Sequence, residues 1–225
     1  MNWFKRSISY LFSLALIVFL LLSAVDYCCF DQKFYLEQYQ KLNTAETIGV
    51  SAETLDQMTS VLLDYLRDEE KTLELVAKVQ GSEREVFNER EIKHMVDVRA
   101  LYQNAMMVRD LCGLLLVLSL IISLLLGDEK KLFWAFKRIF ILFMAVFLAL
   151  LLVAIVDFDF FWTNFHYIFF AGNDLWLLDP RTDILIMMVP LEFFNALVMR
   201  IVGFFFASLA AAALLLFCIK KVNND

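Results

Sequence analysis

Residues 139–156 read IFILFMAVFLALLLVAIV, a run of 18 residues that contains no charged side chain. A helix rises ~1.5 Å per residue and the hydrocarbon core of a bilayer is ~30 Å thick, so ~17–25 apolar residues suffice to cross it. Three further uncharged runs, 7–25, 111–127 and 201–219, reach this length. We therefore predict an all-α integral membrane protein with four transmembrane helices.

The composition of the 225-residue chain agrees with this class. Hydrophobic residues make up 61% and charged residues 20%, with a mean hydropathy of +0.67, whereas soluble proteins average ~45–50% apolar and ~25% charged residues. With 23 Phe, 6 Gly, 2 Pro and 4 Cys, the chain is not disordered, collagen-like or a disulfide scaffold. Cys28 and Cys29 are adjacent and no Cys-x-x-Cys spacing occurs, so we interpret the cysteines as packing thiols.

Lysine and arginine positions predict the orientation, because cytoplasmic segments are enriched in these cations. If the chain crosses four times, the Lys and Arg residues of the N-terminus, of the connection between the second and third spans and of the C-terminal tail all lie on the same side of the membrane. This predicts that both termini are cytoplasmic. Segment 31–110 carries 16 acids and 10 bases and is predicted to form a small helical extracytoplasmic domain. Segment 157–190 is predicted to form an aromatic interfacial loop outside, so 1–225 is one polytopic domain. A nucleic-acid partner is not expected, because no basic surface lies outside. The cytoplasmic cations are Lys5, Arg6, Lys130, Lys131, Lys137, Arg138, Lys220 and Lys221.

The outer segment 31–110 contains two helix-start signals. Ser51 is a suitable N-cap for a helix that ends near Leu66. Asn88 and Glu91 form a second and stronger signal, because an N-cap followed three residues later by Glu matches a capping box. No Pro or Gly follows before Gly113, so this second helix should continue directly into the 111–127 span. If the spanning part began nearer residue 101, two charged residues, Arg109 and Asp110, would lie at membrane depth and should be paired.

In the second outer segment, 157–190, polar residues alternate with a cluster of aromatic residues. The aromatic residues alone would be typical of a membrane interface. Gly172-Asn173 is a turn signal. Asp179-Pro180 predicts the N-cap and first residue of a short helix, and Pro190 the start of the final helix.

His94 and His166 are the only histidines, and both are predicted to lie outside. A histidine titrates near neutral pH and can act as a general acid or base, although a lone histidine beside an acid is often structural. Metal binding by two His and several Asp is chemically allowed, but no local ligand spacing supports it, and we expect neither a metal nor a cofactor. No G-x-S-x-G, P-loop, GxGxxG or H-E-x-x-H motif occurs, so an enzyme of this sequence would use a substrate nucleophile rather than its own.

Three stretches resemble the signature regions of one bacterial family. They are REIKHMVDV (90–98), FHYIFFAGNDLWLLDP (165–180) and TDILIMMVP (182–190). These residues, together with four spans and one histidine in each outer segment, resemble the lipoprotein intramolecular transacylase (Lit) family of Gram-positive bacteria.

The resemblance implies an acyltransferase of the cell membrane with an extracytoplasmic active site. Its substrate would be the diacylated N-terminus of a bacterial lipoprotein, whose sn-2 acyl chain moves from the S-diacylglyceryl group to the α-amino group of the same cysteine. The family's two essential histidines correspond to His94 and His166, and the protein is expected to act as a monomer among membrane lipids. Around them we expect residues that orient a ring or stabilise an oxyanion, and aromatic residues that seat acyl chains. These are Asp97, Arg99, Asn173 and Asp174 for the first role, and Phe165 and Trp176 for the second.

The chemistry suits these residues independently of the resemblance. An α-amino group with a pKa of ~7.7–8.0 must lose a proton before it attacks an ester, and a histidine can take that proton and return one to the leaving oxygen. We expect His166 to be the main acid–base residue and His94 to orient it or share the role. Two other functions are compatible with the sequence: a non-catalytic interaction or sensor protein, and a different enzyme that cleaves outer-leaflet lipid esters. A pH-dependent transporter is disfavoured, because the spans hold almost no ionisable residues.

Overall fold

The computed structural model describes residues 2–127 and 129–222, with side chains described except at Asn2, Glu129, Lys130, Lys220 and Val222. Lys130 and Lys220, two of the cations used to predict the orientation, therefore lie outside the described side chains. The chain divides into two compact units. We call them the bundle unit (Met1–Asp26, Ala105–Phe158 and Met199–Asp225) and the head unit (Tyr27–Asn104 and Asp159–Val198).

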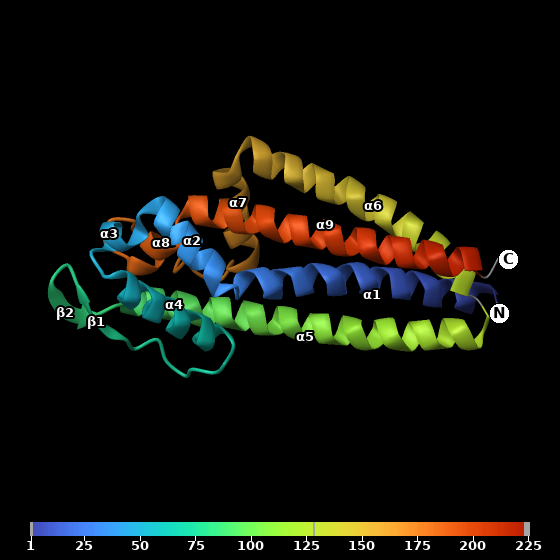
Figure 1. Cartoon of the computed structure of the whole chain (residues 1–225), viewed down its shortest axis with the longest axis horizontal. Coiled ribbons are helices and arrows are strands. Elements are labelled where there is room, and N and C mark those ends of the chain that lie inside the picture. Colours follow the sequence, from blue (N-terminus) through green and yellow to red (C-terminus); the bar gives the residue numbers. More distant parts are fainter. Residues whose placement is uncertain (1, 128, 223–225) are drawn as a thin grey trace. The chain divides into compact units, whose positions relative to one another are not determined.

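The bundle unit is built from four long helices, α1 (Asn2–Cys29), α5 (Glu89–Leu125), α6 (Glu129–Val156) and α9 (Leu191–Val222). All four are long and apolar enough to cross a membrane. The first turn of α1 and the last turn of α9 lie at the same end of the bundle (Figure 1), as an even number of crossings requires. The predicted all-α architecture with four spanning helices is confirmed, whereas the cytoplasmic placement of the termini stays a prediction.

The interior of the bundle is aromatic and aliphatic, and Phe205 and Leu209 of α9 are almost completely buried in it. Gly113 on α5 permits a close approach to α1, because a Cβ at this position would lie 3.2 Å from the Phe19 ring. The buried cluster consists of Phe12, Leu16, Ile17, Ala24, Leu132, Phe136, Phe205, Leu209 and Leu216.

A charged pair links α1 and α5 near one end of the bundle unit. Arg109 Nη1 lies 2.6 Å from the Asp26 carboxylate, and the same guanidinium lies 2.8 Å from Asp110. The pairing expected for Arg109 and Asp110 is therefore present, with Asp26 as a further partner. A partly buried arginine with two carboxylates avoids the cost of an isolated charge in a low-dielectric environment.

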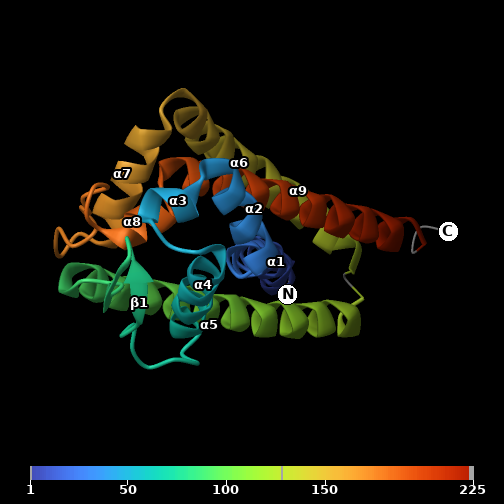
Figure 2. The ribbon, with the colours of Figure 1, turned by 60° about the vertical axis from the view of Figure 1, so that its left-hand side comes forward.

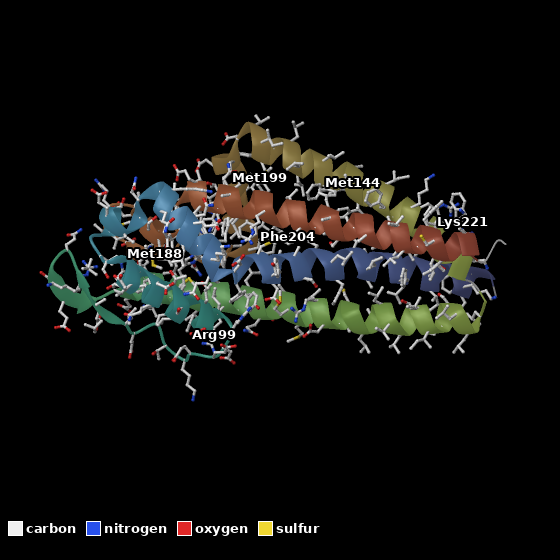
Figure 3. All side chains as sticks on the ribbon, viewed as in Figure 1. Arg99, Met144, Met188, Met199, Phe204 and Lys221 are labelled. Atoms are coloured by element: carbon white, nitrogen blue, oxygen red, sulfur yellow. The ribbon has the colours of Figure 1, made fainter. Side chains whose placement is uncertain are left out.

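The head unit contains short helices α2 (Gln32–Leu42), α3 (Thr44–Ile48), α4 (Ala52–Leu66) and α8 (Ile184–Met188). Figure 2 shows α3 packed against α8, with α2 in contact with both α3 and α4. Phe193, in the first turn of α9, is fully buried against the rings of Phe34, Tyr35 and Tyr39 on α2. The Met188 side chain of α8 is also fully buried (Figure 3).

Both predicted helix starts in the head unit are present. The Ser51 hydroxyl accepts the Thr54 N–H at the start of α4. Asn88 and Glu91 form the expected capping box: the Asn88 side chain accepts the Glu91 N–H at 3.1 Å, and the Glu91 carboxylate accepts the Asn88 N–H at 2.7 Å. As predicted, the helix that begins here continues without interruption to Leu125.

The prediction of a purely helical 31–110 segment missed a β-hairpin formed by β1 (Val76–Val79) and β2 (Ser82–Glu85). Gln80 and Gly81 join the strands with φ values of 50° and 83°, as a two-residue hairpin turn requires. The Gln80 N–H donates to the Gly49 carbonyl at 2.8 Å, which attaches the turn to the end of α3. Because both strands are short and mostly exposed, no alternation of apolar residues marks them in the sequence.

The 157–190 segment is more helical than expected. Residues Phe158–Phe169 form a 12-residue helix, α7, where an aromatic loop was predicted. The prediction that Asp179-Pro180 starts a short helix was wrong: residues 179–182 form a turn, and α8 starts at Ile184 with Asp183 as its N-cap. Asp179 instead directs its carbonyl to the Thr182 and Asp183 N–H groups and its carboxylate to Arg181.

We expect the Arg109–Asp26 pair to show a large coupling in a double-mutant cycle. Replacing Arg109 with Met, or Asp26 with Asn, leaves a partly buried charge with fewer partners, so each single variant should lose about 1–3 kcal/mol of unfolding free energy. The double variant should lose less than the sum of the two. Thermal unfolding of the detergent-solubilised protein measures the cycle. Additive losses in the two single variants would contradict the coupling.

Candidate active site

The candidate site is in the head unit, where the two histidines lie side by side. The ring centroids of His94 on α5 and His166 on α7 are 6.2 Å apart, with an interplanar angle of 35°. The buried ring of Phe170 lies against both, at 5.2 Å from His94 and 5.5 Å from His166. Two residues far apart in the sequence thus meet in one aromatic cluster.

The N-terminal part of α5 that carries His94 extends beyond any bilayer core. A helix of 37 residues is about 56 Å long, nearly twice the ~30 Å of hydrocarbon. The apolar run 111–127 occupies the other end of α5. His94 and its neighbours therefore lie outside the membrane-spanning segment.

His166 has a defined tautomer. Its Nδ1 lies 2.8 Å from the carbonyl oxygen of Trp162, one turn earlier on α7. A carbonyl oxygen only accepts, so Nδ1 carries the proton and Nε2 of the neutral ring keeps its lone pair. Burial lowers the pKa of His166, and the hydrogen bond to Trp162 opposes this shift. His166 is therefore a neutral base at neutral pH.

Two tryptophans surround the His166 ring. Trp176, from the loop after α7, stacks on it at 4.9 Å and 29°, and Trp162 meets it edge-on at 5.0 Å. An aromatic face favours a cation, so stacking on Trp176 should stabilise His166 when it takes up a proton. This arrangement holds the ring in place and tolerates its change of charge.

His94 is more deeply buried, with 7% of its surface exposed, and its Nδ1 has no hydrogen-bond partner among the described residues. The pKa of His94 is lowered to about 4, chiefly by burial and to a lesser extent by the nearby His166 and Arg90, while Asp97 opposes the shift. At neutral pH the His94 ring is therefore uncharged and can offer one N–H and one lone pair.

The loop after α7 is attached to the His94-bearing face of α5 at two points. Arg90 and Asp97 lie four residues before and three residues after His94, on the same helix face. Asn173 donates from Nδ2 to the Asp97 carboxylate at 2.9 Å. Arg90 Nη2 donates to the Asp174 carbonyl oxygen and lies 3.2 Å from the Asp174 carboxylate.

A buried carboxylate anchors the start of α5. Glu91 is 1% exposed and accepts the Asn88 N–H at 2.7 Å and the Leu185 N–H of α8 at 2.6 Å. The Asn88 side chain donates in turn to Asp183, the N-cap of α8. Burial raises the pKa of Glu91, and the two backbone hydrogen bonds oppose the shift.

The supporting residues predicted from the sequence divide into two groups. Asp97 lies on the His94-bearing face of α5, where Asn173 bonds to it and Asp174 pairs with Arg90. Neither aspartate hydrogen-bonds a histidine ring, and the carbonyl of Trp162 sets the tautomer of His166 instead. Arg99 is not brought to the histidines. Arg99, labelled in Figure 3, pairs with Asp68 in the loop after α4 and lies over the Tyr65 ring.

Phe165 and Trp176, expected to face lipid, are both half-buried and lie against His166. Their contact with acyl chains stays a prediction. The large exposed apolar side chains of this segment are Phe160, Tyr167, Ile168, Phe169 and Leu177.

Three residues of the site were missed by the sequence interpretation: Arg90, Trp162 and Phe170. Each lies four residues from a histidine on the same helix or at its end. Helical spacing around His94 and His166 would have identified them, but 157–190 was treated as a loop. In the part of the chain that the structure describes, no group of three or more His, Cys, Asp or Glu could hold a metal ion.

Known structures share this fold. The chain is similar to the membrane integral lipoprotein intramolecular transacylase Lit from Bacillus cereus, with a TM-score of 0.84 and 22% identity over 100% of both chains. Two variants of that protein also match, with a histidine replaced by arginine (TM-score 0.77, 20% identity, 98% of this chain and 92% of that chain) or by alanine (0.79, 21%, 100% and 97%).

The sequence itself matches the family model described as "Lipoprotein intramolecular transacylase Lit" over residues 10–194. A search among curated proteins gives no match. The family model covers most of the chain, including every residue of the candidate site. The protein therefore belongs to the Lit family of lipoprotein intramolecular transacylases and is a multi-pass membrane acyltransferase.

Proposed function

We propose that this protein moves the sn-2 acyl chain of a lipoprotein's S-diacylglyceryl-cysteine onto the α-amino group of the same cysteine, with His166 as general acid–base residue. The product is N-acyl-S-monoacylglyceryl-cysteine. The observation that carries the proposal is the pair of neutral histidines in contact, one of which has a free basic nitrogen.

In the first step the nitrogen of the substrate's α-amino group attacks the ester carbonyl carbon, and His166 Nε2 takes a proton from this amino group. A nitrogen–carbon bond forms and the carbonyl oxygen becomes an oxyanion. Collapse of this intermediate breaks the bond to the glyceryl oxygen, which receives the proton from His166. Acyl groups are conserved, no water is consumed and no acyl-enzyme forms.

His94 supports this step as an uncharged ring. A neutral imidazole beside the reacting ester can donate its N–H to the developing oxyanion without giving up the proton. Its low pKa keeps it uncharged next to His166 when that ring becomes positive. The different environments of the two rings therefore suit His166 to proton transfer and His94 to stabilising the oxyanion.

The rest of the rate acceleration comes from the proximity of the substrate's amine to its ester. Amine and ester belong to one molecule, and holding them in a reactive geometry replaces a bimolecular encounter. General acid–base catalysis adds typically ~10²–10⁴-fold. No metal or cofactor is part of this proposal.

The proposed site faces the extracytoplasmic side, where the diacylated N-terminus of a mature lipoprotein lies at the outer leaflet. The exposed apolar side chains of α7, Ile168 and Phe169 among them, suit the acyl chains and neighbouring membrane lipid. We propose that the protein acts as a monomer, with both histidines, both tryptophans and Phe170 of the site supplied by the same chain.

We expect His166→Gln and His94→Gln each to lower conversion of a reporter lipoprotein at least about 10²-fold, because each removes a group that acts on the reacting atoms. Mass spectrometry of the reporter's N-terminal cysteine measures this in a host that makes only the diacyl form. Wild-type protein should relocate one acyl chain with unchanged total mass.

Asn164→Ala is a matched control for His166. Asn164 also bonds an i−4 carbonyl on α7, that of Phe160 at 2.8 Å, but it forms no hydrogen bond with either histidine. This variant should convert the reporter normally. Full conversion by His94→Gln would contradict the role proposed for His94, and full conversion by His166→Gln would contradict the mechanism itself. An unmodified cysteine with wild-type protein verified in the membrane would favour an interaction protein, and a released fatty acid would favour a lipid esterase.

The low pKa of His94 also predicts how stability depends on pH. The folded ring protonates only near pH 4, whereas an unfolded histidine protonates near 6.5, so the unfolded state binds more protons between these values. The unfolding free energy should therefore fall as the pH drops from about 6.5 to 4. Thermal unfolding over this range should show a smaller decrease in His94→Gln than in wild type. Parallel curves for the two proteins would contradict the shift.

A further inference from the structure

Two buried polar atoms of the head unit have no hydrogen-bond partner among the described residues, and both lie on the same face of α5. They are Arg90 Nε and His94 Nδ1. Buried polar groups in folded proteins are almost always hydrogen-bonded, so each exception requires an explanation. Two exceptions on consecutive turns of one helix face point to a common cause, a ligand that bonds to both.

Among the residues that the structure describes, the Arg90 guanidinium is bonded through Nη2 alone. Its Nη2 bonds the carbonyl oxygen of Asp174 and pairs with the Asp174 carboxylate. This fixes the side chain and leaves Nε–H, on the buried side, as a donor of fixed position. The two other cations on this part of α5 are directed elsewhere, since Lys93 pairs with Glu89 and Arg99 with Asp68.

Both atoms are suited to the same kind of partner. Arginine has donors only, and the neutral ring of His94 can place its single proton on Nδ1. A ligand between them must therefore be an acceptor, and a cationic donor favours an oxygen that gains negative charge during the reaction.

We propose that Arg90 Nε–H and His94 Nδ1–H together bind the carbonyl oxygen of the ester that is cleaved, and stabilise it as the oxyanion. The proposal rests on the proposed function, to which it adds Arg90 as a catalytic residue. Arg90 takes the role that the sequence suggested for Arg99. In the acyl-transfer step the oxyanion then lies on the His94 side, while His166 exchanges the proton with the amine and the glyceryl oxygen.

The variants Arg90→Gln and Arg90→Lys test this assignment. Lysine keeps the charge and can still pair with Asp174, but it has no second donor at the Nε position. If the Nε–H stabilises the oxyanion, both variants should lower kcat about 10²–10³-fold with little change in KM, as loss of one oxyanion donor does elsewhere. The substrate is a synthetic diacylglyceryl-cysteine lipopeptide, and the purified full-length protein is used in lipid nanodiscs.

Two further variants distinguish a direct action of Arg90 on the oxyanion from an effect of Arg90 on the position of the loop after α7. Lys93→Gln removes a cation from the same helix turn on the exposed face and should retain full kcat. Asp174→Asn weakens the attachment of the loop but keeps Arg90 Nε. If Arg90 only anchored the loop, Asp174→Asn would reproduce the loss seen in Arg90→Lys, and this result would overturn the proposal.

Wild-type kcat in Arg90→Lys would also overturn the assignment, because charge alone would then suffice. If Arg90→Gln does not accumulate in the membrane, Arg90→Lys decides the question. The same assay distinguishes failure of the Arg90 assignment from failure of the proposed function. Inactive His166→Gln with fully active Arg90→Lys would reject only the Arg90 assignment, whereas active His166→Gln would reject the histidine mechanism itself.

Discussion

The carboxylate of Glu91 is the interaction on which the arrangement of the head unit depends. It accepts N–H groups from the start of α5 and from the start of α8, 94 residues later in the chain, and it is almost fully buried. Burying a carboxylate is costly unless its oxygens are hydrogen-bonded, so the two helix ends cannot move apart without leaving a buried carboxylate unpaired. His94 lies one turn after this anchor, and the loop that brings Asn173, Asp174 and Trp176 to the site ends at α8.

The site combines two environments that suit two tasks. His166 is held by a carbonyl at one nitrogen and a tryptophan face on its ring, so it can gain and lose a proton without moving. His94 is buried, uncharged and next to an arginine, so it can donate a hydrogen bond while it stays neutral. Acyl transfer within one molecule needs little else, because the nucleophile is supplied by the substrate.

The sequence was sufficient for features that depend on local patterns. Uncharged runs identified the spanning helices, and the Asn88–Glu91 capping box identified the start of α5. The β-hairpin at Gln80-Gly81 was missed because its strands are short and exposed. The start assigned to Asp179 was wrong because Asp183, also an acceptable N-cap, lies one turn later and is held by Asn88.

The histidine pair could be suggested from composition and family resemblance, but its supporting residues depended on tertiary contacts. Arg90 and Arg99 are both arginines on α5 near His94, and sequence alone does not rank them. Arg99 lies five residues after His94, which turns it to a different helix face and toward Asp68. Trp162 is one of the aromatic residues in segment 157–190 that the sequence indicated to be typical of a membrane interface, yet its carbonyl sets the tautomer of His166.

A crossover experiment tests whether the acyl chain is transferred within one substrate molecule. Two lipopeptides with different peptide lengths and differently labelled sn-2 acyl chains are mixed with the purified protein, and the products are sequenced by tandem mass spectrometry. If transfer is intramolecular, every N-acyl chain will come from the same lipopeptide's own glyceryl group. N-acylated products that carry the other lipopeptide's label would contradict it and would indicate a released or enzyme-bound acyl intermediate.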